Sequence, residues 1–189
     1  MYYLRRALCA TSIFWLCLIA PAYAAAQTTA TTYKAYLPLA SAQLQAGSIE
    51  QQVVDLVNQE RRRNGCNANL AISPKLSAAA NRHSADMALH DIFSHTGSDK
   101  STLATRARDA GYTYTQLAEN IAAGYKTPQD AVNAWIKSPG HHANMLNCSL
   151  RETGIGYYYQ ASDQANVRDD AGNIGGPYFY YWTQDFGTQ

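Results

Sequence analysis

The spacing of the apolar residues changes along the chain, from a helical period to runs dominated by aromatic side chains. The runs TGIGYYYQ (153–160) and PYFYYWTQDFG (177–187) are rich in tyrosine, which is typical of β-strands. The polar, glycine-rich segment 161–176 between them predicts a long hairpin loop. Because helical segments come first and strands last, we expect an α+β fold in which helices pack on a small sheet.

Several segments before these runs carry helix signals. Ser73 precedes Pro74, which suits the first position of a helix, and Thr127 with Asp130 forms a capping box. Segment 116–125 predicts a further strand or turn. The predicted helices cover 48–65, 73–91, 101–111, 127–138 and, as a short helix, 138–146.

The charge balance gives no reason to expect binding to nucleic acid. The formal net charge is +1 over 189 residues, too small to attract a polyanion strongly. The run RRR at 61–63 lies in the first predicted helix, and we interpret it as a solvated helix face. We therefore expect no nucleic-acid partner, and we expect the protein to be a monomer.

The N-terminus has the pattern of a secretory signal peptide. Arg5 and Arg6 precede an apolar run over 7–20, and Ala22-Tyr23-Ala24 supplies the small residues of a cleavage site. The apolar run is short for a membrane span of about 20 residues, although an uncleaved anchor stays an alternative. We expect a signal peptide over 1–26, a flexible linker over 27–47 and one domain over 48–189, secreted to the outside of the cell.

Cleavage of this signal peptide would leave two cysteines. Cys9 and Cys17 lie within it, so Cys66 and Cys148 remain in the mature chain. Two cysteines in a secreted domain are expected to pair with each other. Two free buried thiols or a catalytic Cys–His pair are the weaker alternatives, because an oxidising compartment consumes free thiols.

The five histidines lie in three different settings. His83 and His90 fall inside the second predicted helix, where a buried histidine is more common than a ligand. His95 follows in a polar loop, where functional side chains concentrate. His141 and His142 are adjacent in the first turn of the short helix, and adjacent helical residues point about 100° apart. We therefore expect only one of this pair to face a site.

Glu119 is the acidic residue of most interest. It stands in LAENIA, between apolar residues, so we expect it to be partly buried. Near an imidazole, such a carboxylate could orient the ring, act as a base or bind a metal. The sequence contains no HExxH, GxSxG or paired CxxC motif, so it carries no standard protease signature.

A series of short motifs runs along most of the chain. The motifs are NQER (58–61), LSAAANRHSADMA (76–88), FSHTGSD (93–99), AENIAAG (118–124), AWIKSPGHHANML (134–146), TGIGY (153–157) and YWTQDFG (181–187). Each motif alone is weak, but their order is specific, and in this order they resemble the bacterial secreted type of the CAP superfamily, also called the SCP domain. This superfamily includes cysteine-rich secretory proteins, antigen 5 and plant pathogenesis-related proteins.

The resemblance implies a three-layer α/β/α sandwich with a surface cleft that holds two histidines and acidic groups. Carried over by motif, these are His95 from FSHT, Glu119 from AEN and His141 from SPGH. His142 then occupies a variable position of the family. Animal and plant members add a second glutamate as a fourth site residue. At this fourth position the present chain offers only the acid Asp99.

The resemblance implies a binding function more readily than catalysis. We expect a binding module for a divalent metal, a lipid or a cell-envelope ligand. His95, His141 and Glu119 would bind the cation weakly, and zinc suits them better than calcium, which prefers more oxygen ligands. The alternative is an extracellular metal-dependent hydrolase or peptidase, in which Glu119, His95 and His141 would be catalytic and Glu119 would act as the base.

Overall fold

The computed structural model describes residues 47–189 of the 189-residue chain. The expected signal peptide and all of the expected linker except Gly47 lie outside the described residues. Within 47–189, helices and strands are mixed in one α+β domain, as the sequence predicts. No helix of this part of the chain is long and apolar enough to cross a membrane.

The elements follow the predicted order of helices first and long strands last. They are α2 (Ile49–Arg63), β1 (Ala71–Ile72), α3 (Pro74–Leu89), β2 (Ile92–Phe93), α4 (Leu103–Asp109), β3 (Gln116–Ala123), α5 (Pro128–Lys137), α6 (Pro139–Leu146), β4 (Glu152–Tyr159), β5 (Val167–Asp169), β6 (Ile174–Gly175) and β7 (Tyr180–Thr188). The hydroxyl of Ser48 caps α2, and that of Thr127 caps α5 by accepting from Asp130 N, as expected for the capping box.

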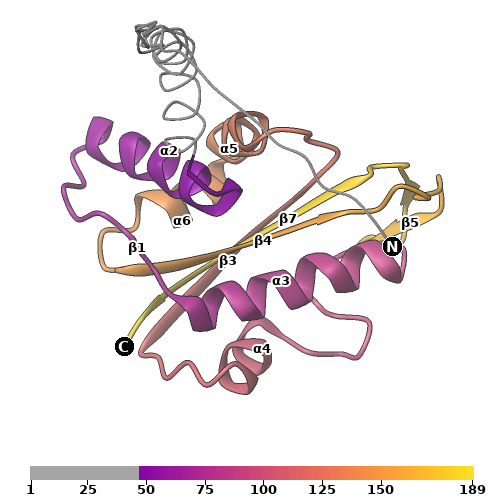
Figure 1. Cartoon of the computed structure of the whole chain (residues 1–189), viewed down its shortest axis with the longest axis horizontal. Helices are drawn as coiled ribbons and strands as arrows, with labels where there is room; N and C mark the ends of the chain where they lie inside the picture. Colours follow the sequence, from indigo (N-terminus) through magenta and orange to yellow (C-terminus); the bar gives the residue numbers. More distant parts are fainter. Residues whose placement is uncertain (1–46) are drawn as a thin grey trace, which may run out of the picture. The chain divides into compact units, whose positions relative to one another are not determined.

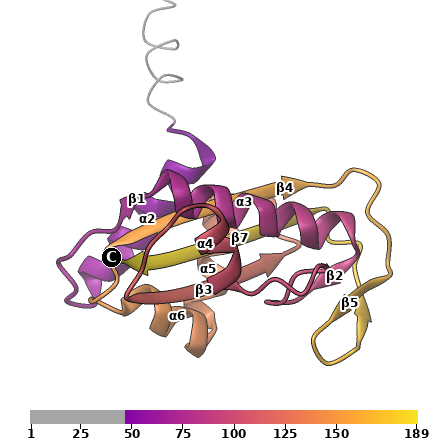
Figure 2. The ribbon, with the colours of Figure 1, turned by 90° about the horizontal axis from the view of Figure 1, so that it is seen from below.

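A four-stranded sheet with the order β1-β4-β7-β3 forms the middle layer. β7 is antiparallel to both β4 and β3, and β3 is an edge strand. Helices α2, α5 and α6 lie on one face of the sheet, and α3 and α4 lie on the other (Figure 1; Figure 2). This is the three-layer α/β/α sandwich that the family resemblance implies.

Segment 161–176 differs from the predicted loop, because it contains two short strands. β5 pairs in parallel with β2 and antiparallel with β6, so the three form a second small sheet. Strands of two or three residues are too short for an alternating pattern to show in the sequence. The segment therefore contributes two strands to a small sheet. Its third strand, β2, directly precedes the loop that carries His95.

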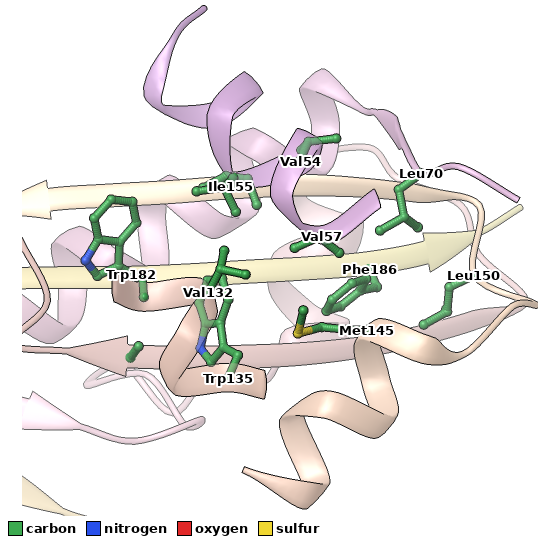
Figure 3. Close-up of a cluster of buried hydrophobic side chains, with 13 residues drawn as sticks. Val54, Val57, Leu70, Val132, Trp135, Met145, Leu150, Ile155, Trp182 and Phe186 are labelled. Carbon is green, nitrogen blue, oxygen red and sulfur yellow. The ribbon is translucent and has the colours of Figure 1, made fainter. Parts of the chain in front are cut away.

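The main hydrophobic core lies between the sheet and the helices α2, α5 and α6 (Figure 3). Trp135 of α5 and Trp182 and Phe186 of β7 are fully buried there. On the opposite face α3 lies very close to β4. A Cβ on Gly154 would come within 2.0 Å of Ser77 N, and one on Gly156 within 2.1 Å of Ala80 O. Only glycine fits there, so these two positions set the distance between helix and sheet.

The positions of Arg61 and His90 in the structure differ from those predicted from the sequence. Arg61 is not part of a solvated face but is fully buried, because its guanidinium donates to four backbone carbonyls, those of Ala68, Met145, Asn147 and Leu150. His90 was expected inside the helix but is exposed at its C-cap.

The predicted disulfide between Cys66 and Cys148 is present. It joins the segment after α2 to the segment after α6, and it links residues 82 positions apart in the sequence. Together with the Arg61 contacts to Met145 and Asn147, it fixes the C-terminal end of α6 against α2. The helix α6 carries His141, one of the expected site residues.

Candidate functional site

His95, Glu119 and Arg106 form a hydrogen-bonded cluster on the α3 side of the sheet. Glu119 lies on the edge strand β3 and is only 7% exposed. One of its oxygens accepts from His95 Nδ1 at 2.8 Å, and the other accepts from Arg106 Nη2 at 2.6 Å. Arg106, on α4, also donates to the carbonyl of His95 and to that of Ser101. The protein itself therefore satisfies both oxygens of the Glu119 carboxylate.

The charges of this cluster favour an ionised Glu119. Burial alone would raise the pKa of the carboxyl, but the hydrogen bond from His95 and the positive charges around it outweigh burial, so the pKa is lowered. The hydrogen bond to Glu119 in turn raises the pKa of His95. Glu119 is thus an anion whose charge is balanced by Arg106. It also anchors His95 through Nδ1, so Nε2 is the ring nitrogen of His95 that is left for a ligand.

Two further buried titratable residues lie behind Glu119. His83 is fully buried, its Nε2 lies 2.9 Å from the Ser94 carbonyl, and burial lowers its pKa. Asp185 lies directly opposite Glu119 in the pairing of β3 with β7, so both side chains share one face of the sheet. Asp185 is fully buried, neither of its carboxyl oxygens has a partner within 47–189, and burial and the Glu119 charge raise its pKa. Burial therefore favours the neutral form of both groups.

His141 reaches the same region from the other side of the edge strand. Asn120 donates to the His141 carbonyl at 3.1 Å, and Asn144 donates to the Glu119 carbonyl at 3.2 Å. These two bonds dock α6 against β3. Burial, with the nearby charge of His95, lowers the pKa of His141, so its imidazole is neutral near pH 7.

A hollow of about 330 Å³, which we call the His141 groove, runs along the edge strand. Its walls include Phe93 and Tyr178 on one side and Trp135 and His141 on the other, with Ile121 of β3 between them. Trp135 Nε1 donates to the Ile121 carbonyl at 3.1 Å, and Asn144 occupies the Glu119 carbonyl. Side chains thus occupy edge carbonyls that another strand would need for pairing.

His142, which was not expected in the site, and Asp99, the possible fourth site residue, lie elsewhere. His142 points toward α2, with its Nε2 2.9 Å from Glu60 Oε1. Asp99 forms an ion pair with Arg82 at 2.7 Å and accepts from Ser101 N, and it makes no hydrogen bond to His95, Glu119 or His141. The structure therefore brings His95 and Glu119 together and places His141 in the adjoining groove. Asp99 is part of neither the cluster nor the groove.

Sequence reasoning missed Arg106 and Asp185. Arg106 lies in LATRARD, where it looks like any other charged residue of a helix. Asp185 could have been found from one signal, because it is the one charged residue within a run that is rich in aromatic residues. Its position opposite Glu119 depends on the register of two strands that are about 65 residues apart, and no local pattern fixes that register.

The expected metal ligands do not fit a three-residue site in this arrangement. Glu119 is occupied by His95 and Arg106, so a cation would have to displace a buried guanidinium to reach it. Two imidazoles are left, and a zinc site normally has three or four protein ligands. Among residues 47–189, no group of three or more His, Cys, Asp or Glu side chains is arranged to hold a metal ion.

Comparison with known proteins agrees with the sequence motifs. The family model described as the Cysteine-rich secretory protein family (CAP) matches residues 54–186. That span contains the whole Glu119 cluster and the whole His141 groove. The chain is also 35% identical over 122 residues to YkwD of Bacillus subtilis (strain 168), described as an uncharacterized protein. This match covers 65% of the chain and 47% of YkwD, so the chain spans about half the length of that relative.

Solved structures share the fold. An extracellular protein containing an SCP domain from Bacillus anthracis str. Ames matches with a TM-score of 0.60 and 27% identity, covering 75% of this chain and 40% of that chain. An outer surface protein from Borrelia burgdorferi matches with a TM-score of 0.56 and 19% identity, covering 74% of this chain and 91% of that chain. The second likeness concerns the fold alone.

Proposed function

Because the chain belongs to the cysteine-rich secretory protein (CAP) family, we propose that it is a secreted binding module whose ligand, a lipid or another component of the cell envelope, lies in the His141 groove. Secretion is supported by the signal-peptide pattern over 1–26. It also agrees with the description of the Bacillus anthracis neighbour as an extracellular protein.

The observation that carries this proposal is the chemistry of the groove walls. Aromatic and aliphatic side chains form most of the lining, and its volume of about 330 Å³ is within the usual range of small-molecule sites. His141 adds a neutral imidazole, which offers one hydrogen-bond donor and one acceptor. An apolar hollow with one polar group at its wall suits a ligand with an apolar body that needs to be oriented.

The alternative, a hydrolase with Glu119 as its base, is less well supported by this geometry. A general base needs to be within reach of the proton that it takes, and it needs a pKa near the working pH. Glu119 is buried and engaged by His95 and Arg106, and its pKa is lowered rather than raised. We assign Glu119 the role of anchoring His95, and no step of the proposed function requires a metal.

Blocking the groove tests the proposal. Ala134 of α5 lies in its wall, so Ala134→Phe would fill part of the hollow. The neutral fluorescent probe N-phenylnaphthylamine should bind the wild-type protein and lose at least about tenfold in affinity with this variant, which corresponds to about 1.4 kcal/mol. Ala78→Phe, at an exposed position of α3 on the other side of the sheet, is the matched control and should bind as the wild type does. Equal binding by all three proteins would refute the assignment of the ligand to this groove.

A further inference from the structure

A second hollow adjoins the His141 groove. It has a volume of about 370 Å³ and lies between the loop 124–126 and one face of α5 formed by positions 130, 133, 134 and 137. Tyr125 and Ala134 line both hollows. Gly124 borders the second hollow and lies against Tyr178 of the first, because a Cβ on Gly124 would be 3.5 Å from Tyr178 Cδ1. The two hollows therefore adjoin and share part of their walls, and we refer to the pair as the depression.

The second hollow, which we call the lysine hollow, differs from the first in its charge. Lys126 and Lys137 are both exposed, and neither forms an ion pair with any residue of 47–189. The one acid of the hollow, Asp130, is held by Thr127, whose hydroxyl donates to it at 2.6 Å while Asp130 N donates to that hydroxyl. Two cations against one engaged carboxylate leave this hollow with a net positive charge.

The depression is thus apolar in its first part and basic in its second. A neutral ligand would leave the two ammonium groups unused, whereas a ligand with an acidic group would place that group near them. The acidic group would gain from both charges, since each lies on the wall of the same hollow. His141 belongs to the apolar part and is neutral near pH 7, so it provides no competing cation there.

We propose that the ligand of this depression is an anionic amphiphile, whose apolar portion fills the His141 groove and whose carboxylate or phosphate group binds between Lys126 and Lys137. This inference rests on the proposed function and adds to it the chemical class of the ligand. Each lysine contributes as one partner of a solvent-exposed ion pair, so the loss of one lysine should weaken binding only about two- to fivefold.

The experiment compares two ligands that differ only in their head group. Dodecanoate and dodecanol, titrated calorimetrically into the full chain below their aggregation limits, have the same apolar chain. We expect dodecanoate to bind about five- to twentyfold more tightly at low salt. The difference should shrink to less than about twofold in about 1 M sodium chloride, where the Debye length is about 3 Å. Dodecyl phosphate should behave as dodecanoate does, whereas binding of dodecyl phosphate alone would restrict the site to phosphate groups and overturn the carboxylate half of the inference.

Variants that remove one lysine charge test whether the preference for dodecanoate over dodecanol arises in the lysine hollow. Lys126→Gln and Lys137→Gln should each weaken dodecanoate binding about two- to fivefold and leave dodecanol binding unchanged. Lys75→Gln, an exposed lysine of α3 on the other side of the sheet, is the matched control and should change neither. If dodecanoate and dodecanol bind equally well to the wild type, the acidic head group is wrong while the apolar groove stands. If neither ligand binds and N-phenylnaphthylamine does not bind either, the proposed function fails as well.

Discussion

Removal of the Arg106 guanidinium should destabilise the domain far more than removal of an exposed arginine. Arg106 is 1% exposed and donates to Glu119, Ser101 and His95. In Arg106→Met, Glu119 would remain buried with His95 as the hydrogen-bond partner left to its carboxylate. Leaving one partner of a buried ion pair without its counter-charge costs about 3–5 kcal/mol. We expect a loss of that size in the free energy of unfolding at pH 7, measured by urea denaturation.

A double-mutant cycle separates the ion pair from simple packing. Glu119→Gln alone should also destabilise, because it leaves Arg106 buried without an anion. The double variant Arg106→Met/Glu119→Gln contains neither charge, so its loss should be smaller than the sum of the single losses by at least about 1.5 kcal/mol. Additive losses would refute the interpretation that the two charges balance each other.

An exposed arginine provides the matched control. Arg82 forms ion pairs with Asp99 and Asp109 at 2.7 and 2.8 Å, distances close to that of the buried pair, but its side chain is 42% exposed. Arg82→Met should cost no more than about 1 kcal/mol, because water screens such pairs. A loss for Arg106→Met as small as that for Arg82→Met would show that the Glu119 charge is not held by Arg106.

Three further predictions concern the acid behind the site, the disulfide and the histidine pair. The folded-state pKa of Asp185 lies above its ordinary value, so the contribution of Asp185 to stability falls as pH rises from about 4 through that pKa. An asparagine has no such dependence. The stability of Asp185→Asn relative to wild type should therefore increase between pH 4 and pH 7 in thermal melts. A pH-independent difference would contradict this. Replacing Cys66 and Cys148 by alanine should lower the free energy of unfolding by about 2–4 kcal/mol in urea, and an unchanged midpoint would contradict the role of the cross-link. Calorimetry with zinc should show only weak binding, which is lost in His141→Ala. The binding should be nearly unchanged in His142→Ala, because the His142 ring contacts Glu60 of α2. Equal losses in the two variants would mean that the wrong imidazole is assigned.

Local signals in the sequence were sufficient for most of the elements. Ser48 and Thr127 cap the helices that they were expected to begin, and Gly154 and Gly156 lie in a strand recognised from its tyrosines. His141 and His142 point to different places, the groove and α2, as the 100° between adjacent helical residues requires. These features depend only on residues that are close together in the chain.

Features that depend on distant residues could not be predicted in the same way. Arg61 is buried because carbonyls more than 80 positions later surround it, and nothing in RRR distinguishes it from its exposed neighbours. The partnership of Glu119 with Arg106 likewise arises when α4 packs beside β3. Tyr159 ends the tyrosine run that identifies β4, yet it is 52% exposed, which the run itself does not show.

Mapping the amide chemical shifts of the protein during titration with dodecanoate tests the location of the ligand most directly. Binding in the groove predicts that the largest changes occur in 121–126, at the edge strand and its loop, and in 134–141, at the end of α5 and the start of α6. The exposed face of α3, around Ala78 and Arg82, should show none. Changes centred on α3, or dodecanoate binding that leaves the shifts of 121–126 and 134–141 unaltered, would contradict the account.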